Sequence, residues 1–447
     1  MKIIIAGAGD VGFHLAKLLS SANQEITLID INEDVLEYAA NHLDVFTIKG
    51  DASSLKVLDQ ADTSSANMFL ALTTSETTNL VASILAKKIG AKQTIARVSN
   101  SEYLSLMQRE NFAELGIDHL ISPIELAANE VERLVKHCEV TDHFAFEGGK
   151  VTLNGVTLDN TSKLIGQTIG DIADQNQAFQ FKPVAVLRNN EETIIPNRHT
   201  KLQSNDHVYF MSPADQINPL LQLLGKELKK IRNIMILGGT GLGLKSALLL
   251  EKKHNVTIVE KDKNICKKLI EKLDHTLVIK GDPSNIELLK EEGLDRMHAV
   301  IALTANSEIN IIACLTAEKL GVFKTIALVD NTDYTHISQH IGVDTLINKK
   351  LVAANNIFRF VRKGRVEAIT SLHGVDAEAI EYLVHKNNQL TKKAIKDLPL
   401  PENAMIAVVI RDNETIIPDP DFHLAINDKV IIMAMEKAVG VVERLFK

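Results

Sequence analysis

A glycine-rich loop near the start of the chain has the residue types and the spacing of a phosphate-binding turn. It follows a short run of β-branched residues and comprises Gly7, Ala8, Gly9, Asp10, Val11 and Gly12. The first glycine of such a loop makes a tight turn, the second lets backbone approach a pyrophosphate, and the third lets strand and helix pack closely. The N–H groups that begin the next helix then face the phosphates. The loop predicts nucleotide binding; the competing interpretation is that its glycines only serve packing.

Polar residues follow at positions that suit the rest of a nucleotide. Asp30 ends the second expected strand about 20 residues after the loop, where a carboxylate can accept hydrogen bonds from both ribose hydroxyls. Asp51 and Ala52 follow the third strand, on the side where adenine lies. Thr73 ends the fourth strand, at the ligand edge of such a sheet. For Asp51 and Thr73, a turn or packing role is the alternative.

Two charged residues of the predicted site need their own explanation. Asp10 lies inside the loop, where a carboxylate beside a pyrophosphate costs Coulomb energy, and it could instead cap the helix. Arg97 ends the fifth expected strand and is a candidate phosphate partner. An ordinary surface ion pair is the alternative for Arg97.

The chain contains an internal repeat with an offset of 231 residues. This offset aligns Lys2–Leu19 with Asn233–Leu250 and Lys49–Ser53 with Lys280–Ser284. A second, shorter repeat relates Arg188–Pro196 to Arg411–Pro418. One register kept over such a distance indicates a tandem duplication. The predicted domains are 1–140, 141–225, 232–364 and 365–447, with the joint between the halves near residues 225–232.

The second copy of the loop departs from the pattern. Thr240 stands where the first copy has Gly9, and Leu328 stands where it has Arg97. We therefore expect the second cleft to bind a nucleotide differently, more weakly or not at all. The candidate site residues of this copy are Gly238, Gly243, Glu260, Asp282 and Thr304.

Short β-branched runs alternate with helical patterns in both long segments. Strands are expected at 3–6, 26–29, 45–48, 69–72 and 94–98, and helices at 11–20 and 79–89. Such alternation predicts an α/β fold with two Rossmann-like, doubly wound parallel sheets, each followed by a small α+β domain. Two long amphipathic helices, 126–137 and 352–363, are expected to dock on a neighbouring copy and to transmit ligand binding between domains.

Composition and charge exclude several classes of protein. The 447 residues carry a formal net charge of −8, which argues against a nucleic-acid binder. No apolar run is long enough to span a bilayer, so we expect a soluble, cytoplasmic chain. The three cysteines are too dispersed for a disulfide framework, and no spacing predicts a metal site. A basic cluster is either a solvated helix end or a contact with a membrane partner; it comprises Lys349, Lys350, Arg359, Arg362, Lys363 and Arg365.

These motifs together resemble the TrkA family, whose members carry tandem RCK (regulator of potassium conductance) domains. The resemblance rests on the duplicated plan, the loop at 7–12, Asp30, the segment 49–52, the segment 71–73 and the segment 95–98. It implies a non-enzymatic regulatory subunit with NAD(H), ATP or ADP in its clefts. It also implies a homo-oligomeric ring, expected to be a tetramer. The ring would lie on the cytoplasmic face of the inner membrane, against an integral membrane potassium-translocating subunit of the Trk type.

Two other functions remain open at this level. An NAD-dependent dehydrogenase would need a general acid in the small domains, and the sequence shows no compact set of residues for that role. A soluble nucleotide sensor that regulates another class of transporter is the second alternative.

Overall fold

Four sheets organise the chain, in two kinds. The computed structural model describes residues 1–20, 24–176, 180–189, 191–226, 229–331, 343–362, 368–371, 375–385 and 389–446. Within these residues, two six-stranded parallel sheets have the strand orders β3-β2-β1-β4-β5-β6 and β14-β13-β12-β15-β16-β17. Two five-stranded antiparallel sheets have the orders β10-β9-β11-β8-β7 and β18-β19-β22-β20-β21. The predicted fold class is confirmed, including the duplication.

The first parallel sheet and its helices form the unit that carries the first glycine loop. Its strands are β1 (Lys2–Ala6), β2 (Glu25–Asp30), β3 (Phe46–Lys49), β4 (Met68–Ala71), β5 (Gln93–Arg97) and β6 (His119–Ile121). Its helices are α1 (Asp10–Ser20), α2 (Glu33–His42), α3 (Leu55–Gln60), α4 (Glu76–Ile89), α5 (Leu106–Glu114) and α6 (Pro123–Lys136). The two central strands are almost wholly buried, as the β-branched runs predict for a sheet covered on both faces.

The second parallel sheet repeats this plan. Its strands are β12 (Asn233–Leu237), β13 (Asn255–Glu260), β14 (Leu277–Lys280), β15 (Ala299–Ala302), β16 (Lys324–Leu328) and β17 (Thr345–Ile347). Its helices are α9 (Gly241–Leu250), α10 (Lys263–Lys272), α11 (Ile286–Glu291), α12 (Ser307–Lys319) and α14 (Lys349–Arg362). The glycine loops therefore lie at the carboxyl ends of β1 and β12, where parallel sheets bind ligands.

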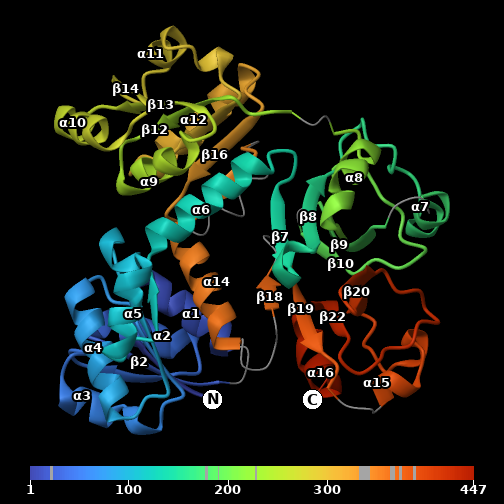
Figure 1. Ribbon diagram of the computed structural model, residues 1–447, viewed down its shortest axis with the longest axis horizontal. Helices are drawn as coiled ribbons and strands as arrows, with labels where there is room; N and C mark the ends of the chain where they lie inside the picture. Colours follow the sequence, from blue (N-terminus) through green and yellow to red (C-terminus); the bar gives the residue numbers. More distant parts are fainter. Residues whose placement is uncertain are drawn as a thin grey trace.

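The long helix after each parallel sheet packs on the other half of the chain. α6 buries Ala127 and Val131 in one apolar cluster with Ala247 of α9. α14 buries Ile357 in one cluster with Leu15 of α1. Figure 1 shows the orange α14 beside α1, among the blue elements of the first unit, while α6 reaches α9. The predicted docking of these helices on a neighbouring copy is confirmed, and that copy lies in the same chain.

The two small domains pack on each other. The first contains β7 (Asp142–Phe146), β8 (Val151–Thr157), β9 (Lys182–Arg188), β10 (Glu192–Ile194), β11 (His207–Pro213), α7 (Ile169–Gln175) and α8 (Ile217–Leu223). The second contains β18 (Ala368–Ser371), β19 (Ala377–Leu383), β20 (Ala404–Arg411), β21 (Glu414–Ile416), β22 (Lys429–Met435), α15 (Gln389–Lys392) and α16 (Glu436–Phe446). Leu153 and Val408, one from each domain, belong to a single buried cluster. The domain boundaries given above stay predictions, and the boundary at 364/365 lies outside the described residues.

A buried ion pair explains the short repeat in the small domains. Arg188 donates to both carboxylate oxygens of Asp206, at 3.0 and 2.8 Å, and Arg411 holds Asp428 in the same way at 2.8 Å. Both aspartates are buried. Because an unpaired buried carboxylate costs free energy, the arginine and the aspartate of each pair are needed together, and both recur in the second copy.

No helix among the residues described here is long and apolar enough to cross a membrane.

Two stacked histidines join α6 to the first small domain. The rings of His137 and His143 are 3.8 Å apart between centroids, at an interplanar angle of 16°. Burial lowers the pKa of His137 to about 4, and His143, Lys136 and Arg133 add to the effect through their charges. Burial also lowers the pKa of His143. Both rings are therefore neutral at pH 7.

Acidification is expected to destabilise this joint. Because the unfolded chain protonates His137 near its ordinary pKa of 6.5, it takes up the proton before the folded chain does as the pH falls. The free energy of unfolding should therefore decrease between pH 6.5 and about 4. Urea denaturation at pH 7.5, 6 and 5 measures this slope, and His137→Gln should flatten it. The control is His199→Gln, at an exposed turn. Equal slopes for wild type and His137→Gln would contradict the prediction.

Candidate functional site

The three glycines of the first loop have three different surroundings. Gly7 has φ +103°, and a Cβ there would lie 2.8 Å from the Thr73 backbone nitrogen. A Cβ on Gly12 would lie 1.8 Å from the Gly7 carbonyl oxygen. A Cβ on Gly9 would meet nothing within 4 Å. The turn therefore requires Gly7, and the close packing of the loop on the helix requires Gly12. Gly9 faces open space, where a ligand can approach.

The carboxylate that ends the second strand also holds the loop in place. The Ala8 N–H donates to Asp30 Oδ2 (2.7 Å), and the Asn32 N–H donates to Oδ1 (2.9 Å). In the second copy the longer Glu260 accepts from the Gly239 N–H at 2.6 Å. A Cβ on Gly239 would lie 3.1 Å from Cγ of Glu260. The second copy therefore combines a longer acid with a glycine, where the first copy combines Asp30 with Ala8. Sequence reasoning assigned Asp30 to the ribose and missed this second role.

The aspartates after the third strands lie in local turns. Asp51 Oδ1 accepts from the N–H and the hydroxyl of Ser53, at 2.8 and 2.7 Å, and these bonds lower the pKa of Asp51. Asp282 makes the same turn with Ser284, and its pKa is lowered for the same reason. Both carboxylates are therefore ionised acceptors at neutral pH. Asp51 lines the cavity described below.

A buried asparagine that sequence reasoning did not assign to the site holds its edge together. Asn79 Oδ1 accepts from the N–H and the hydroxyl of Thr73, at 2.9 and 2.7 Å. Its Nδ2 donates to the carbonyls of Thr73 (3.0 Å) and Arg97 (2.9 Å). The ends of β4 and β5 are thereby tied to α4. Asn310 makes the equivalent bonds to Thr304 and to the Leu328 carbonyl. The repeat offset of 231 residues also aligns Asn79 with Asn310, and this alignment was the available signal in the sequence.

Replacement of Asn79 by alanine is expected to lower the free energy of unfolding by about 2–4 kcal/mol, because several partner groups lose their bonds at a buried site. Chemical denaturation followed by circular dichroism measures the loss. Asn310→Ala should cost a similar amount, whereas Asn41→Ala, on an exposed helix position, should change stability little. A loss below 1 kcal/mol at Asn79 would count against the role of this side chain.

A cavity of about 850 Å³ opens over the first loop. This volume is in the range of small-molecule and cofactor sites. Most of the predicted first-copy residues line it: Gly7, Gly9, Asp10, Val11, Asp30, Asp51, Ala52, Thr73 and Arg97. Ala8 and Gly12 are buried and are not among the lining residues. Of the second-copy candidates, Thr304 lines the cavity, whereas Gly238, Gly243, Glu260 and Asp282 are not among its lining residues.

Arg97 contributes a half-buried guanidinium to this cavity. Burial lowers its pKa, and within the described chain no carboxylate pairs with its guanidinium. A cation that is partly desolvated without a partner costs free energy unless an anion joins it. The surface ion pair considered as an alternative for Arg97 is therefore not what the described residues form. The guanidinium is placed to receive an anionic ligand.

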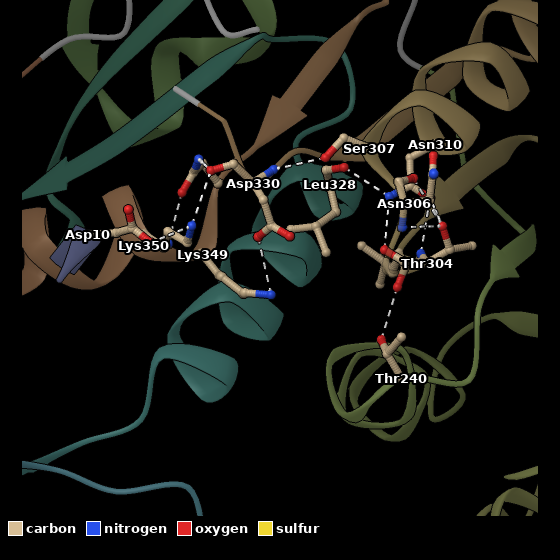
Figure 2. Close-up of polar contacts among 12 residues, drawn as sticks. Asp10, Thr240, Thr304, Asn306, Ser307, Asn310, Leu328, Asp330, Lys349 and Lys350 are labelled. Carbon is tan, nitrogen blue, oxygen red and sulfur yellow. Dashed lines mark hydrogen bonds and ion pairs between the residues drawn. The ribbon is translucent and has the colours of Figure 1, made fainter. Parts of the chain in front are cut away.

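Two lysines from the other half of the chain reach the same cavity. Lys350 Nζ lies 2.7 Å from Asp10 Oδ2, and Lys349 Nζ lies 3.3 Å from Asp330 Oδ1. Both lysines begin α14 and line the cavity (Figure 2). Of the basic cluster noted in the sequence, these two form ion pairs at the cavity and are not simply a solvated helix end, whereas a contact with a membrane partner stays a prediction. The side chains of Arg359 and Arg362, and residues Lys363 and Arg365, lie outside the described part.

A polar cluster in the first small domain contains a histidine, an aspartate and a tyrosine. The Tyr209 hydroxyl donates to Asp142 Oδ2 (3.0 Å), and His207 Nε2 lies 3.5 Å from the same oxygen. However, all three residues are buried in the small domain, away from the cavity. The cluster is placed to order the sheet.

Comparisons with known proteins agree with this architecture. The TrkA-N domain family matches residues 3–123 and 234–349, and the TrkA-C domain family matches residues 155–225 and 379–447. The Trk system potassium uptake protein TrkA of Halomonas elongata is 32% identical over 452 residues, covering 100% of this chain and 99% of that protein. The TrkA homolog of Archaeoglobus fulgidus is 32% identical over 451 residues, covering all of both chains.

Solved structures show the same fold at low sequence identity. The crystal structure of the GsuK RCK domain has a TM-score of 0.61 at 17% identity, covering 100% of this chain and 94% of that one. The GsuK channel bound to NAD has a TM-score of 0.62 at 17% identity, covering 99% and 78%. With two copies of each domain, in alternating order and over nearly its whole length, this chain belongs to the TrkA family.

Proposed function

We propose that this chain is the regulatory, non-enzymatic subunit of a Trk-type potassium-uptake system and responds to a nucleotide in its first cleft. The observation that supports nucleotide binding is Arg97, a half-buried cation without a partner among the described residues, beside a glycine loop whose middle glycine faces open space. The potassium role is supported by full-length relatives named as Trk system potassium uptake proteins.

The proposed ligand is NAD(H), with ATP or ADP as alternative or additional ligands. Asp30 favours a free ribose diol, because a carboxylate repels a 2′-phosphate. The GsuK channel, which has the same fold, has been solved bound to NAD.

The proposed mechanism is thermodynamic linkage. A nucleotide shifts the subunit between two shapes only by the difference in its affinity for them, and a coupling of about 1–3 kcal/mol is typical. α6 and α14 support a path, because each connects one parallel sheet to the other half. In the proposed assembly a homo-oligomeric ring of these chains lies on the cytoplasmic face of the inner membrane, against the potassium-translocating subunit.

Growth at limiting potassium tests the proposal. The host would have, as its only uptake route, a Trk channel without its regulatory subunit, and the cognate channel subunit would be co-expressed. Wild type should restore growth, and Arg97→Leu should not, although it folds. Arg97 is preferred to Asp30 because Asp30 also holds the loop. Lack of rescue by folded wild type would contradict the transport role, and equal rescue by Arg97→Leu would contradict the nucleotide dependence.

A further inference from the structure

The two glycine loops differ at the position of the middle glycine. Thr240, which replaces Gly9, donates its hydroxyl to the Leu303 carbonyl (3.0 Å) and accepts from the Gly243 N–H (3.2 Å). Its side chain therefore caps α9 from within the loop. In the first copy, by contrast, the space in front of Gly9 is open. Where a phosphate can approach α1, the second copy has a protein hydroxyl.

Cations gather at the first loop. Arg97 comes from the first half, and Lys349 and Lys350 come from the second half at the start of α14. Their counterparts are apolar. Leu328, which is buried, stands at the repeat position of Arg97, and Pro123 and Ile124 begin α6 as Lys349 and Lys350 begin α14. The first loop thus has three cations nearby, whereas the second has hydrocarbon side chains. Because a pyrophosphate is multiply charged, it should bind at the first loop.

The cavity likewise covers the nucleotide-binding positions of the first copy and not those of the second. It includes the ribose and adenine positions of the first copy, Asp30 and Asp51, but its lining does not include Glu260 or Asp282. The Glu260 side chain is buried, and its two oxygens accept from the N–H groups of Gly239 and Asp262. From the second half, the lining includes Thr240 and Thr304 at the loop edge, and also Leu328, Asp330, Lys349 and Lys350, which Figure 2 shows.

Each of the two lysines has a carboxylate partner that a ligand can replace, and Lys350 Nζ also lies 3.5 Å from the Asp330 carbonyl oxygen. Asp10, the partner of Lys350, is 72% exposed at its side chain, whereas Lys350 is 27% exposed. A phosphate between the loops would therefore compete with Asp10 for a partly buried ammonium group.

We infer that each chain binds one nucleotide, with its phosphates between Arg97 of the first half and Lys349 and Lys350 of the second, and that the second cleft is a wall of this composite site. The inference rests on the proposed function for the ligand being a nucleotide. It goes further, because the ligand then contacts both halves and its phosphates loosen the Asp10–Lys350 ion pair that joins them.

Calorimetric titration of the full-length chain with NADH and with ATP tests the stoichiometry. We expect one equivalent per chain for each probe, and mutual competition. Two equivalents per chain would overturn this inference and leave the proposed function intact. Binding of neither probe would overturn both.

Two substitutions test the composite nature of the site. Lys350→Met should weaken ATP binding about tenfold or more, as expected for the loss of one charge-assisted bond. The matched control is Lys319→Met, an exposed lysine of the same half, away from the cavity. Asp10→Asn should strengthen ATP binding several-fold, because the competing carboxylate is removed. Melting temperatures check folding. An ATP affinity of Lys350→Met equal to that of the control, or weaker binding by Asp10→Asn, would overturn the inference.

Discussion

Arg97→Leu is expected to lower the affinity of the chain for NADH about 30-fold or more and to leave its melting temperature unchanged or slightly raised. The loss corresponds to about 2 kcal/mol, as for a hydrogen bond to a charged group. Stability should not fall, because the guanidinium is half-buried without a partner among the described residues, so its removal relieves a desolvation cost. NADH fluorescence titration and thermal denaturation measure the two effects.

The chain offers a matched control for this substitution on the same strand region. Lys92 is exposed at the opposite end of β5, and Lys92→Leu removes a positive charge without touching the cavity. Its NADH affinity should equal that of wild type. If Arg97→Leu lost stability but kept affinity, Arg97 would be a structural residue and the phosphate assignment would be wrong.

Alanine at two glycines of one loop should separate folding from binding. Gly12→Ala should lower the free energy of unfolding by about 3 kcal/mol or more, because the new Cβ would overlap the Gly7 carbonyl oxygen at 1.8 Å and backbone must move. Gly9→Ala should leave stability within about 1 kcal/mol of wild type, since nothing lies within 4 Å of its Cβ. It should nevertheless weaken NADH binding, because the methyl group occupies the approach of the pyrophosphate.

Urea denaturation and NADH titration of the two variants provide the test. A second, internal control is Gly243→Ala, whose Cβ would lie 2.1 Å from the Gly238 carbonyl oxygen and should destabilise the second unit in the same way. Comparable stability of Gly9→Ala and Gly12→Ala would mean that the loop relaxes, and the assigned roles of the two glycines would not hold.

Much of the first unit was predictable from short stretches of sequence. The β-branched runs, the glycine loop and Asp30 lie where the pattern puts them, and β1 is Lys2–Ala6 as against the expected 3–6. Such features depend on neighbours a few residues away, so periodicity and spacing carry the information. The strand β6 (His119–Ile121) was not predicted, because three residues are too few for a periodic signal.

The site, by contrast, took its final composition from contacts between distant parts of the chain. By itself, the sequence determined the duplication, the alternation of strands and helices, and the loop that suits a phosphate. Only the tertiary structure decided that Lys350 lies beside Asp10 and that Thr240 closes the second loop onto the Leu303 carbonyl. The physical reason is that such pairs depend on where α6 and α14 cross between the halves. That crossing is set by the burial of apolar faces, which no local pattern assigns to a particular partner.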